Sequence, residues 1–176
     1  MLFKETVLQG AFIIEVDPRR DDRGFYARTW CRREFEAHGL QSNFVQGGFS
    51  FSGKKGTLRG MHYQIAPHGQ PKLVRCGKGS IYDVILDLRP ESATFKKWFA
   101  IELTEHNHRM IYVPEGLAHG FQTLEDNTEV CYQMAGFHDS AAERGISWND
   151  PAFNIAWPPD NRIMSERDRN FKGFVE

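Results

Sequence analysis

Short stretches in which apolar and polar residues alternate recur along the whole chain. A period of two predicts β-strands that turn one face to a core and the other to solvent. Turn-forming residues separate these stretches, for example at 53–56, 77–79 and 125–127. The predicted strands are residues 11–16, 43–52, 57–63, 71–76, 79–87, 98–103, 109–113, 116–123 and 128–134. Many short strands at such spacing indicate an all-β sandwich or barrel.

Helical periodicity is rare in this pattern. Residues 32–39 predict one short helix, which Gly39 ends. The tail beyond Trp157 holds two prolines and then a polar stretch, and we expect one helical turn there, laid over the barrel. The sequence shows no linker, internal repeat or low-complexity segment, so residues 1–176 are predicted to form a single domain.

The composition narrows the classes of protein. With 176 residues, of which 40% are hydrophobic, the chain is long enough to bury a core. Its net charge of -1 and its interleaved basic and acidic residues argue against a nucleic-acid or anionic-membrane partner. No apolar run approaches the roughly 20 residues of a membrane span, and the opening MLFKETVLQG lacks the apolar region of a signal peptide. We therefore expect a soluble, cytoplasmic protein.

The three cysteines, Cys31, Cys76 and Cys131, lie far apart in the sequence. A chain of this length folds without disulfides, so we expect reduced thiols. The CxxC spacing typical of zinc sites does not occur, which argues against a zinc site built from these residues.

The candidate chemistry concentrates in two segments, GTLRGMHYQ at 56–64 and PEGLAHGF at 114–121, with Lys72 between them. These segments place two histidines, an arginine and a lysine on strands that we expect to be neighbours. Such a set converges in the mouth of a small barrel, where it can hold an anion and move protons. The sequence therefore predicts an enzymatic pocket.

The histidines differ in their surroundings. Residues 60, 62 and 64 share one face of a predicted strand, and His62 and Gln64 lie on that face, where a core would hold aliphatic residues. His62 is thus either a pocket residue or a buried histidine bonded to a backbone carbonyl. His119 lies in a P-x-G-x-x-H turn that resembles the second motif of cupin barrels. We expect the other histidines to be solvated surface residues: His38, His68, His106, His108 and His138.

The residues around His62 do not favour a metal. Cupins usually bind a metal through two histidines and an acid in their first motif and one histidine in their second. Here Gln64 replaces the second histidine, and no acid follows it before Asp83. Two imidazoles with an amide are a poor site for zinc or ferrous iron. We therefore predict no metal and no cofactor, with His62 as a general base, Lys72 beside an enolate and a phenol such as Tyr132 as a proton donor.

Several blocks of the sequence resemble the signature of one enzyme family. The blocks are DDRGFY at 21–26, GTLRGMHYQ at 56–64, QPKLVR at 70–75, YDVILDLR at 82–89, PEGLAHGF at 114–121, ERGISWNDP at 143–151 and SERD at 165–168. Their order over nearly the whole chain is similar to that of the dTDP-4-dehydrorhamnose 3,5-epimerase family. The resemblance implies a cupin-like jelly-roll barrel with short flanking helices, usually a homodimer. It also implies inversion of carbon centres beside the ketone of a nucleotide-linked 4-keto-6-deoxy sugar, without metal or cofactor.

The resemblance assigns four catalytic residues. His62 is the base that takes the C3 or C5 proton, and Asp168 orients it, since an imidazole held by a carboxylate keeps one tautomer. Lys72 stabilises the negative charge that forms on the carbonyl oxygen. Tyr132 protonates the opposite face of the enolate. A base and a donor on opposite faces of the sugar ring make an epimerase.

Further positions match family residues that bind the nucleotide diphosphate and the sugar, where a guanidinium suits phosphate oxygens. Asp83 and His119 are expected to support the catalytic network or to contact the sugar. The other predicted substrate-binding residues are Arg23, Phe25, Arg28, Gln46, Arg59, Glu143 and Arg167.

Two segments depart from the family pattern. Arg28 stands where an acid commonly follows the aromatic pair, and Gln46-Gly47-Gly48 replaces QDN. Both lie where the family holds the nucleotide. The nucleotide carrier therefore stays open among dTDP, CDP, GDP and UDP, as does inversion at one carbon or both.

Two other classes of protein fit the barrel. One is a sugar 3,4-ketoisomerase, which a Tyr132 turned away from His62 would favour, and the other is a non-catalytic cupin that binds a nucleotide sugar.

Overall fold

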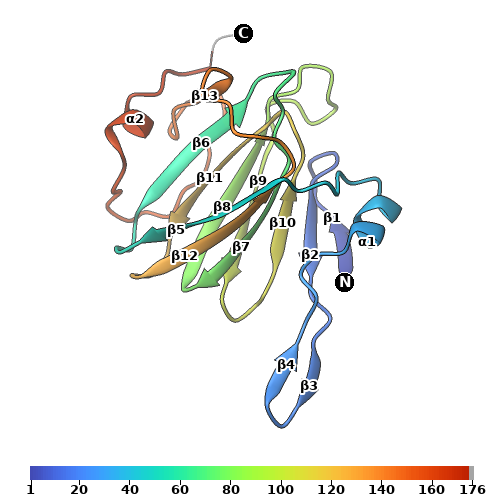
Figure 1. The fold of residues 1–176 in the computed structure, drawn as a ribbon. Coiled ribbons are helices and arrows are strands. Elements are labelled where there is room, and N and C mark those ends of the chain that lie inside the picture. The colour runs from blue at the N-terminus through green and yellow to red at the C-terminus, as the bar shows by residue number, and fades with distance from the viewer. Residues whose placement is uncertain (175–176) are drawn as a thin grey trace.

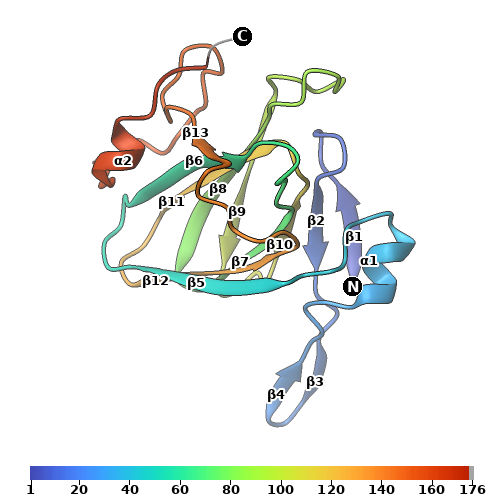
Figure 2. The ribbon, with the colours of Figure 1, turned by 45° about the horizontal axis from the view of Figure 1, so that its top comes forward.

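Two antiparallel β-sheets face each other and form an open barrel (Figures 1 and 2). The computed structural model describes residues 1–174. The first sheet has six strands in the order β1 (Leu2–Glu5), β2 (Phe12–Glu15), β10 (Met110–Val113), β7 (Lys72–Lys78), β12 (Thr128–Met134) and β5 (Gln46–Ser52). The second has five strands in the order β13 (Glu143–Gly145), β6 (Leu58–Gln64), β11 (Leu117–Thr123), β8 (Ser80–Asp87) and β9 (Trp98–Thr104).

Smaller elements lie outside the two sheets. β3 (Arg19–Asp21) and β4 (Gly24–Tyr26) form a hairpin that extends away from the barrel (Figure 1). Helix α1 (Arg32–Ala37) lies beside β1, and α2 (Glu166–Arg169) lies on the far side of the barrel, near β6 (Figures 1 and 2). In the part of the chain that the structure describes, no helix is long and apolar enough to cross a membrane.

The alternation of the sequence locates most of the sheet correctly. Each of the nine predicted strands is present, and the prediction of an all-β barrel with short flanking helices is confirmed. The helix predicted at 32–39 is α1, and the helical turn expected in the tail is α2. The pattern missed β1, β3, β4 and β13. Every residue of β3 and β4 is exposed, and β13 has only three residues. These strands therefore lack the alternation of apolar and polar residues that identifies a strand in the sequence.

The space between the sheets is filled by alternate residues of facing strands. Val74 and Ile111 of the six-stranded sheet pack with Ile81, Ile85 and Phe121 of the five-stranded sheet, and each of these side chains is at most 1% exposed. Burial of such a side chain is worth about 1.5–3 kcal/mol. This apolar cluster forms the core between the two sheets, and Phe121 and Tyr132 connect it to the polar cavity.

The outer face of the five-stranded sheet is covered by the C-terminal segment. Phe153 and Trp157 pack on Leu58, Val84 and Leu86 in a second apolar cluster. Strand β8 is therefore buried on both faces, which explains its nearly continuous apolar run. The segment then returns to the barrel mouth, where it places α2 beside β6 (Figure 2).

Candidate active site

A cavity of about 380 Å³ lies at the open end of the barrel, between the two sheets. Both sheets and the C-terminal segment contribute to its wall. The lining residues are Ser50, Arg59, His62, Gln70, Lys72, His119, Phe121, Tyr132, Met134, Ser165, Arg167 and Asp168. Seven of these were predicted from the sequence, among them the four proposed catalytic residues. The fold therefore brings together residues that lie up to 118 positions apart (50 to 168).

His62 is paired with Asp168 at the cavity wall. The His62 Nε2 lies 2.8 Å from Asp168 Oδ1, and the Gly60 amide donates to Asp168 Oδ2 at 3.1 Å. Burial acts to raise the pKa of Asp168, but the hydrogen bonds from His62, Gly60 and Ser165 and the charge of His62 outweigh it and lower that pKa. An ionised carboxylate only accepts, so the shared proton belongs to Nε2. The Nδ1 of His62 is then free to accept a proton.

A second imidazole and carboxylate pair lies deeper. His119 Nε2 is 2.8 Å from Asp83 Oδ2, and the two residues are 4% and 0% exposed. Burial raises the pKa of Asp83, against the opposing effects of His119 and Lys72. The Oδ1 of Asp83 finds no hydrogen-bond donor among residues 1–174. This pair supports the cavity from the side of β8 and β11.

Lys72 begins β7, on the sheet that faces His62. Desolvation lowers the pKa of its ammonium, while the charges of Glu143 and Asp83 act to raise it. Lys72 has no ion-pair partner within the described part of the chain. A cation in this setting can stabilise a negative oxygen of a ligand.

Tyr132 lies on β12, in the same sheet as Lys72 and across the cavity from β6 and β11. Its hydroxyl is 3.4 Å from Ser50 Oγ, and its ring meets His119 edge to face with the centroids 6.3 Å apart. Burial raises the pKa of the Tyr132 phenol far above its ordinary value. The phenol therefore stays protonated and can donate a proton into the cavity opposite His62.

The charged residues at the rim include two predicted arginines. Arg59 donates to Ser52 Oγ at 3.3 Å and to the Phe51 carbonyl at 3.1 Å. Arg167 of α2 forms an ion pair of 2.7 Å with Glu143 of β13. Both guanidinium groups are exposed enough to meet phosphate oxygens at the mouth.

Gln46 and Gln64 act on the loops that border the mouth. Gln46 Oε1 accepts from the His138 amide at 2.7 Å, and Gln64 donates to the carbonyls of His68 and Phe137. Gln64 is therefore polar on an otherwise apolar strand face because its side-chain amide binds the backbone of two loops.

Six of the nine predicted substrate-binding residues do not line the cavity. Asp83, Glu143 and Gln46 are next to it as partners of the lining residues His119, Arg167 and Met134. The other three lie away from it. Arg23 lies on the projecting hairpin, where its side chain is 90% exposed and pairs with Asp21. Phe25 packs on His108, with the ring centroids 5.0 Å apart, and Arg28 pairs with Glu34 at 2.8 Å. Figure 1 shows this hairpin on the opposite side of the barrel from α2.

The structure adds lining residues that the sequence did not single out, including Ser50, Gln70 and Ser165. Ser50 lies four positions after Gln46 on the same strand face, so the period of two could have indicated it. Ser165 caps α2 by accepting from the Asp168 amide at 3.1 Å, and the S-x-x-D spacing is a known signal of a helix start. Of the histidines expected at the surface, His108 is half-buried, and the others are exposed.

The donor set of the cavity bears on metal binding. Among residues 1–174, no group of three or more His, Cys, Asp or Glu residues is arranged to hold a metal ion. His62 and His119 each use Nε2 to bind a carboxylate. The residues present are therefore suited to proton transfer by side chains.

An antiparallel barrel with a carboxylate-bound imidazole on one sheet, and a lysine and a tyrosine on the other, has the side chains of a small β-barrel enzyme that transfers protons. The sequence profile of dTDP-4-dehydrorhamnose 3,5-epimerase matches residues 5–176. The chain belongs to this family and is an isomerase of the epimerase class.

Individual relatives agree over the full length. The dTDP-4-dehydrorhamnose 3,5-epimerase of Shigella flexneri is 42% identical over 173 residues, which cover 98% of this chain and 95% of the relative. That of Methanothermobacter thermautotrophicus is 41% identical, with 99% and 95% covered. A crystal structure of the Bacillus anthracis enzyme with TDP and PPi bound superposes with a TM-score of 0.95 at 39% identity, with 98% and 99% covered. The predicted cupin-like jelly roll is thereby confirmed.

Proposed function

We propose that this protein is a cofactor-independent epimerase of a nucleotide-linked 4-keto-6-deoxy sugar. It inverts C3, C5 or both beside the ketone and is most like dTDP-4-dehydro-6-deoxyglucose 3,5-epimerase. One observation carries the proposal: His62, held by Asp168, and Tyr132 line one cavity from opposite sheets. A sugar ring bound between the sheets meets a base on one face and a proton donor on the other.

The reaction is two proton transfers. Nδ1 of His62 accepts the proton alpha to the ketone, and the electrons of the broken C–H bond move into an enolate. Lys72 stabilises the charge on its oxygen, because an ammonium in a partly dry cavity lowers such a barrier by several kcal/mol. Tyr132 then gives its proton to the opposite face of the carbon. The imidazolium loses a proton to water and the phenolate regains one, which restores the resting state.

Two other functions are disfavoured by the same geometry. A sugar 3,4-ketoisomerase has no need for a base and a donor on opposite walls, yet Tyr132 faces the cavity and contacts His119. A non-catalytic nucleotide-sugar cupin would tolerate loss of His62 or Lys72, and both are present at the cavity wall. An epimerase acting on a CDP, GDP or UDP sugar, or at a single carbon, uses the same residues and is distinguished by experiment.

The deciding experiment is incubation with a panel of dTDP, CDP, GDP and UDP 4-keto-6-deoxy sugars in deuterated water. Mass spectrometry and NMR give the position of the label and the configuration at C3 and C5. We expect deuterium at an inverted carbon beside the ketone. Migration of the ketone to C3 would establish a ketoisomerase, and binding without label would establish a silent cupin.

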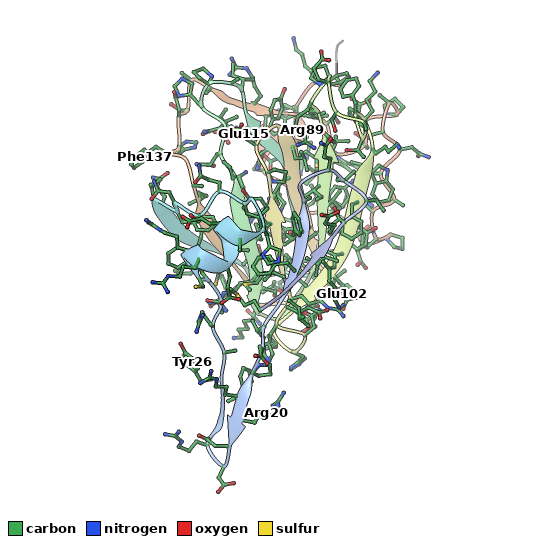
Figure 3. All side chains as sticks on the ribbon, turned by 90° about the vertical axis from the view of Figure 1, so that its right-hand side faces the viewer. Arg20, Tyr26, Arg89, Glu102, Glu115 and Phe137 are labelled. Carbon is green, nitrogen blue, oxygen red and sulfur yellow. The ribbon has the colours of Figure 1, made fainter. Side chains whose placement is uncertain are left out.

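We further propose that the enzyme works as a cytoplasmic homodimer of single-domain chains. Strand β5 turns Phe49 and Phe51 to the outside, where they are 70% and 49% exposed. The hairpin carries Tyr26, 70% exposed, away from the barrel (Figure 3). A second copy would cover these apolar groups and receive Arg23 and Phe25 at its cavity. Light scattering should give twice the chain mass, and Phe49→Glu should shift it to the monomer.

A further inference from the structure

The base of this site depends on a segment outside the barrel. His62 belongs to β6, but its partner Asp168 belongs to α2, which has four residues. The position of the imidazole is therefore set partly by how the C-terminal segment docks on the barrel. A contact of that segment with His62 itself comes from Phe171, two residues beyond α2.

A notch beside His62 receives the Phe171 ring. On β13, the residue directly paired with His62 is Gly145. A Cβ at Gly145 would collide with three ring carbons of Phe171, so the ring occupies the space that a side chain at this position would need. The ring of Phe171 meets that of His62 edge to face, with the centroids 5.6 Å apart and the planes at 80°.

Phe171 also contacts the rim of the cavity. The guanidinium carbon of Arg167 lies 5.7 Å from the Phe171 ring centroid, and Arg167 pairs with Glu143 on β13. One aromatic ring thus touches the base, the segment that carries its carboxylate and the notch in β13.

We propose that Phe171 is a positioning residue for the base. Seated at Gly145, its ring fixes the plane of the His62 imidazole and shields the His62–Asp168 hydrogen bond from water. The inference rests on the proposed function, in which Nδ1 of His62 must point at a carbon of the sugar.

The physical need for such a contact follows from the torsions of histidine. The χ2 angle of a histidine is broad, so a single hydrogen bond at Nε2 leaves the ring free to pivot about that bond. An aromatic ring packed against the imidazole prevents this rotation. A misplacement of about 1 Å in a reacting group can cost on the order of 100-fold in rate.

The first test compares two alanine variants of the same tail. Phe171→Ala is expected to lower kcat about tenfold and to leave KM within about twofold, because the substrate contacts remain. Phe174→Ala is the matched control. Phe174 packs on Phe153 and Phe95, with ring centroids 5.4 and 6.2 Å apart, and has no ring contact with His62. Equal losses of kcat in the two variants would show a general loosening of the tail and overturn the proposal.

The second test needs no turnover and separates this proposal from the proposed function. In nitrogen-15 NMR of labelled histidine, the wild type should show His62 as one tautomer with a slowly exchanging Nε2 proton. Phe171→Ala should broaden or lose that proton signal, and Phe174→Ala should keep it. An unchanged His62 signal in Phe171→Ala would overturn the positioning role, whatever sugar the enzyme accepts.

A double-mutant cycle tests the seat at Gly145. Gly145→Ala should displace the ring and reproduce the Phe171→Ala loss, and the double variant should be no worse than either single one. Additive losses would mean that Gly145 acts by another route. Phe171→Leu keeps apolar volume in the notch, so this variant replaces Phe171→Ala in the test if Phe171→Ala folds poorly. It should retain the Nε2 signal better than Gly145→Ala, and equal loss would count against the proposal.

Discussion

His62 and His119 lie directly opposite each other on the paired strands β6 and β11, and each is bonded through Nε2 to a carboxylate at 2.8 Å. The two pairs differ in exposure. The side chain of His62 is 29% exposed, while that of His119 is 5% exposed. Two similar pairs in adjacent positions therefore differ in exposure, and the imidazole of His62 is the more accessible of the two from the cavity.

The first prediction concerns the base and the cation. We expect His62→Asn and Lys72→Ala each to reduce solvent exchange at the sugar by about 100-fold or more, since one removes the base and the other leaves the enolate uncompensated. The measurement is deuterium uptake by NMR. His106→Asn in an exposed turn and Lys78→Ala at the exposed end of β7 are the controls. Normal exchange in either site variant would reassign that residue.

The second prediction separates the base from the donor. In Tyr132→Phe the enolate still forms, but no phenol quenches it on the far face. His62 then returns an exchanged proton to the original face, which gives deuterium incorporation with retained configuration. The label and the configuration at C3 and C5 are measured in the same product. Tyr63→Phe, on the opposite face of β6, is the control. Full inversion by Tyr132→Phe would remove this residue from the mechanism.

A third prediction is that activity survives exhaustive chelation, because the described cavity residues supply base, cation and donor as side chains. Rates are measured before and after treatment with a strong chelator, with metal analysis of the treated enzyme. Loss of activity that a single stoichiometric divalent metal restores would contradict the prediction.

The fourth prediction concerns the nucleotide carrier. Gly48 pairs with Tyr132 across β5 and β12, and a Cβ there would meet no heavy atom of residues 1–174 within 4 Å. We expect this open space to favour a nucleotide other than dTDP. Gly48→Asn, which restores the family residue, should shift kcat/KM towards dTDP. Gly47→Ala, on the other face of β5, is the control. A wild-type preference for dTDP by about tenfold over CDP, GDP and UDP would refute this.

The fifth prediction concerns stability in acid. Asp87 is fully buried and accepts from Arg89, Ser92 and Thr94 at 2.6 to 2.9 Å. Burial acts to raise the pKa of Asp87, but these hydrogen bonds lower it from 3.8 to about 2. The folded state thus gains roughly 2 kcal/mol above the unfolded pKa, and this gain is lost as the pH falls from about 4 through about 2.

Urea unfolding of Asp87→Asn and the wild type checks this prediction. The difference in the free energy of unfolding should be present at neutral pH and shrink below about pH 4. Glu91→Gln, an exposed carboxylate in the same loop, should show no such difference. A gap between Asp87→Asn and the wild type that stays constant with pH would count against the role of this carboxylate.

The sequence predicts this fold well where one face of a strand is buried. The pattern around Ile81 and Ile85 or Val74 carries the burial signal, so those strands were found. The β3–β4 hairpin is exposed at every strand residue and therefore carries no such signal. Arg23 and Phe25 lie on this hairpin, where they contact Asp21 and His108 and not the cavity of the same chain.

Two kinds of signal in the sequence point to the proposed catalytic residues. A polar residue on an apolar strand face pointed to His62, but no local pattern connects it with Asp168, which lies 106 positions later. That pair came from the resemblance to a family. The contact of Phe171 with Gly145 and His62 was not predictable either, because a glycine and a tail phenylalanine show their relation only once the segment has docked.

Asp168 is synthesised after all the strands of the barrel, because the chain is made from its N-terminus. Every strand of the barrel precedes this residue in the chain, so both sheets can be made while the base still lacks its carboxylate. Contacts between positions this far apart in sequence form late, because the loop that they close is long. A ribosome-bound chain would therefore hold a barrel with an unsupported imidazole. The protein would gain its activity only when the segment around residue 168 has emerged and docked.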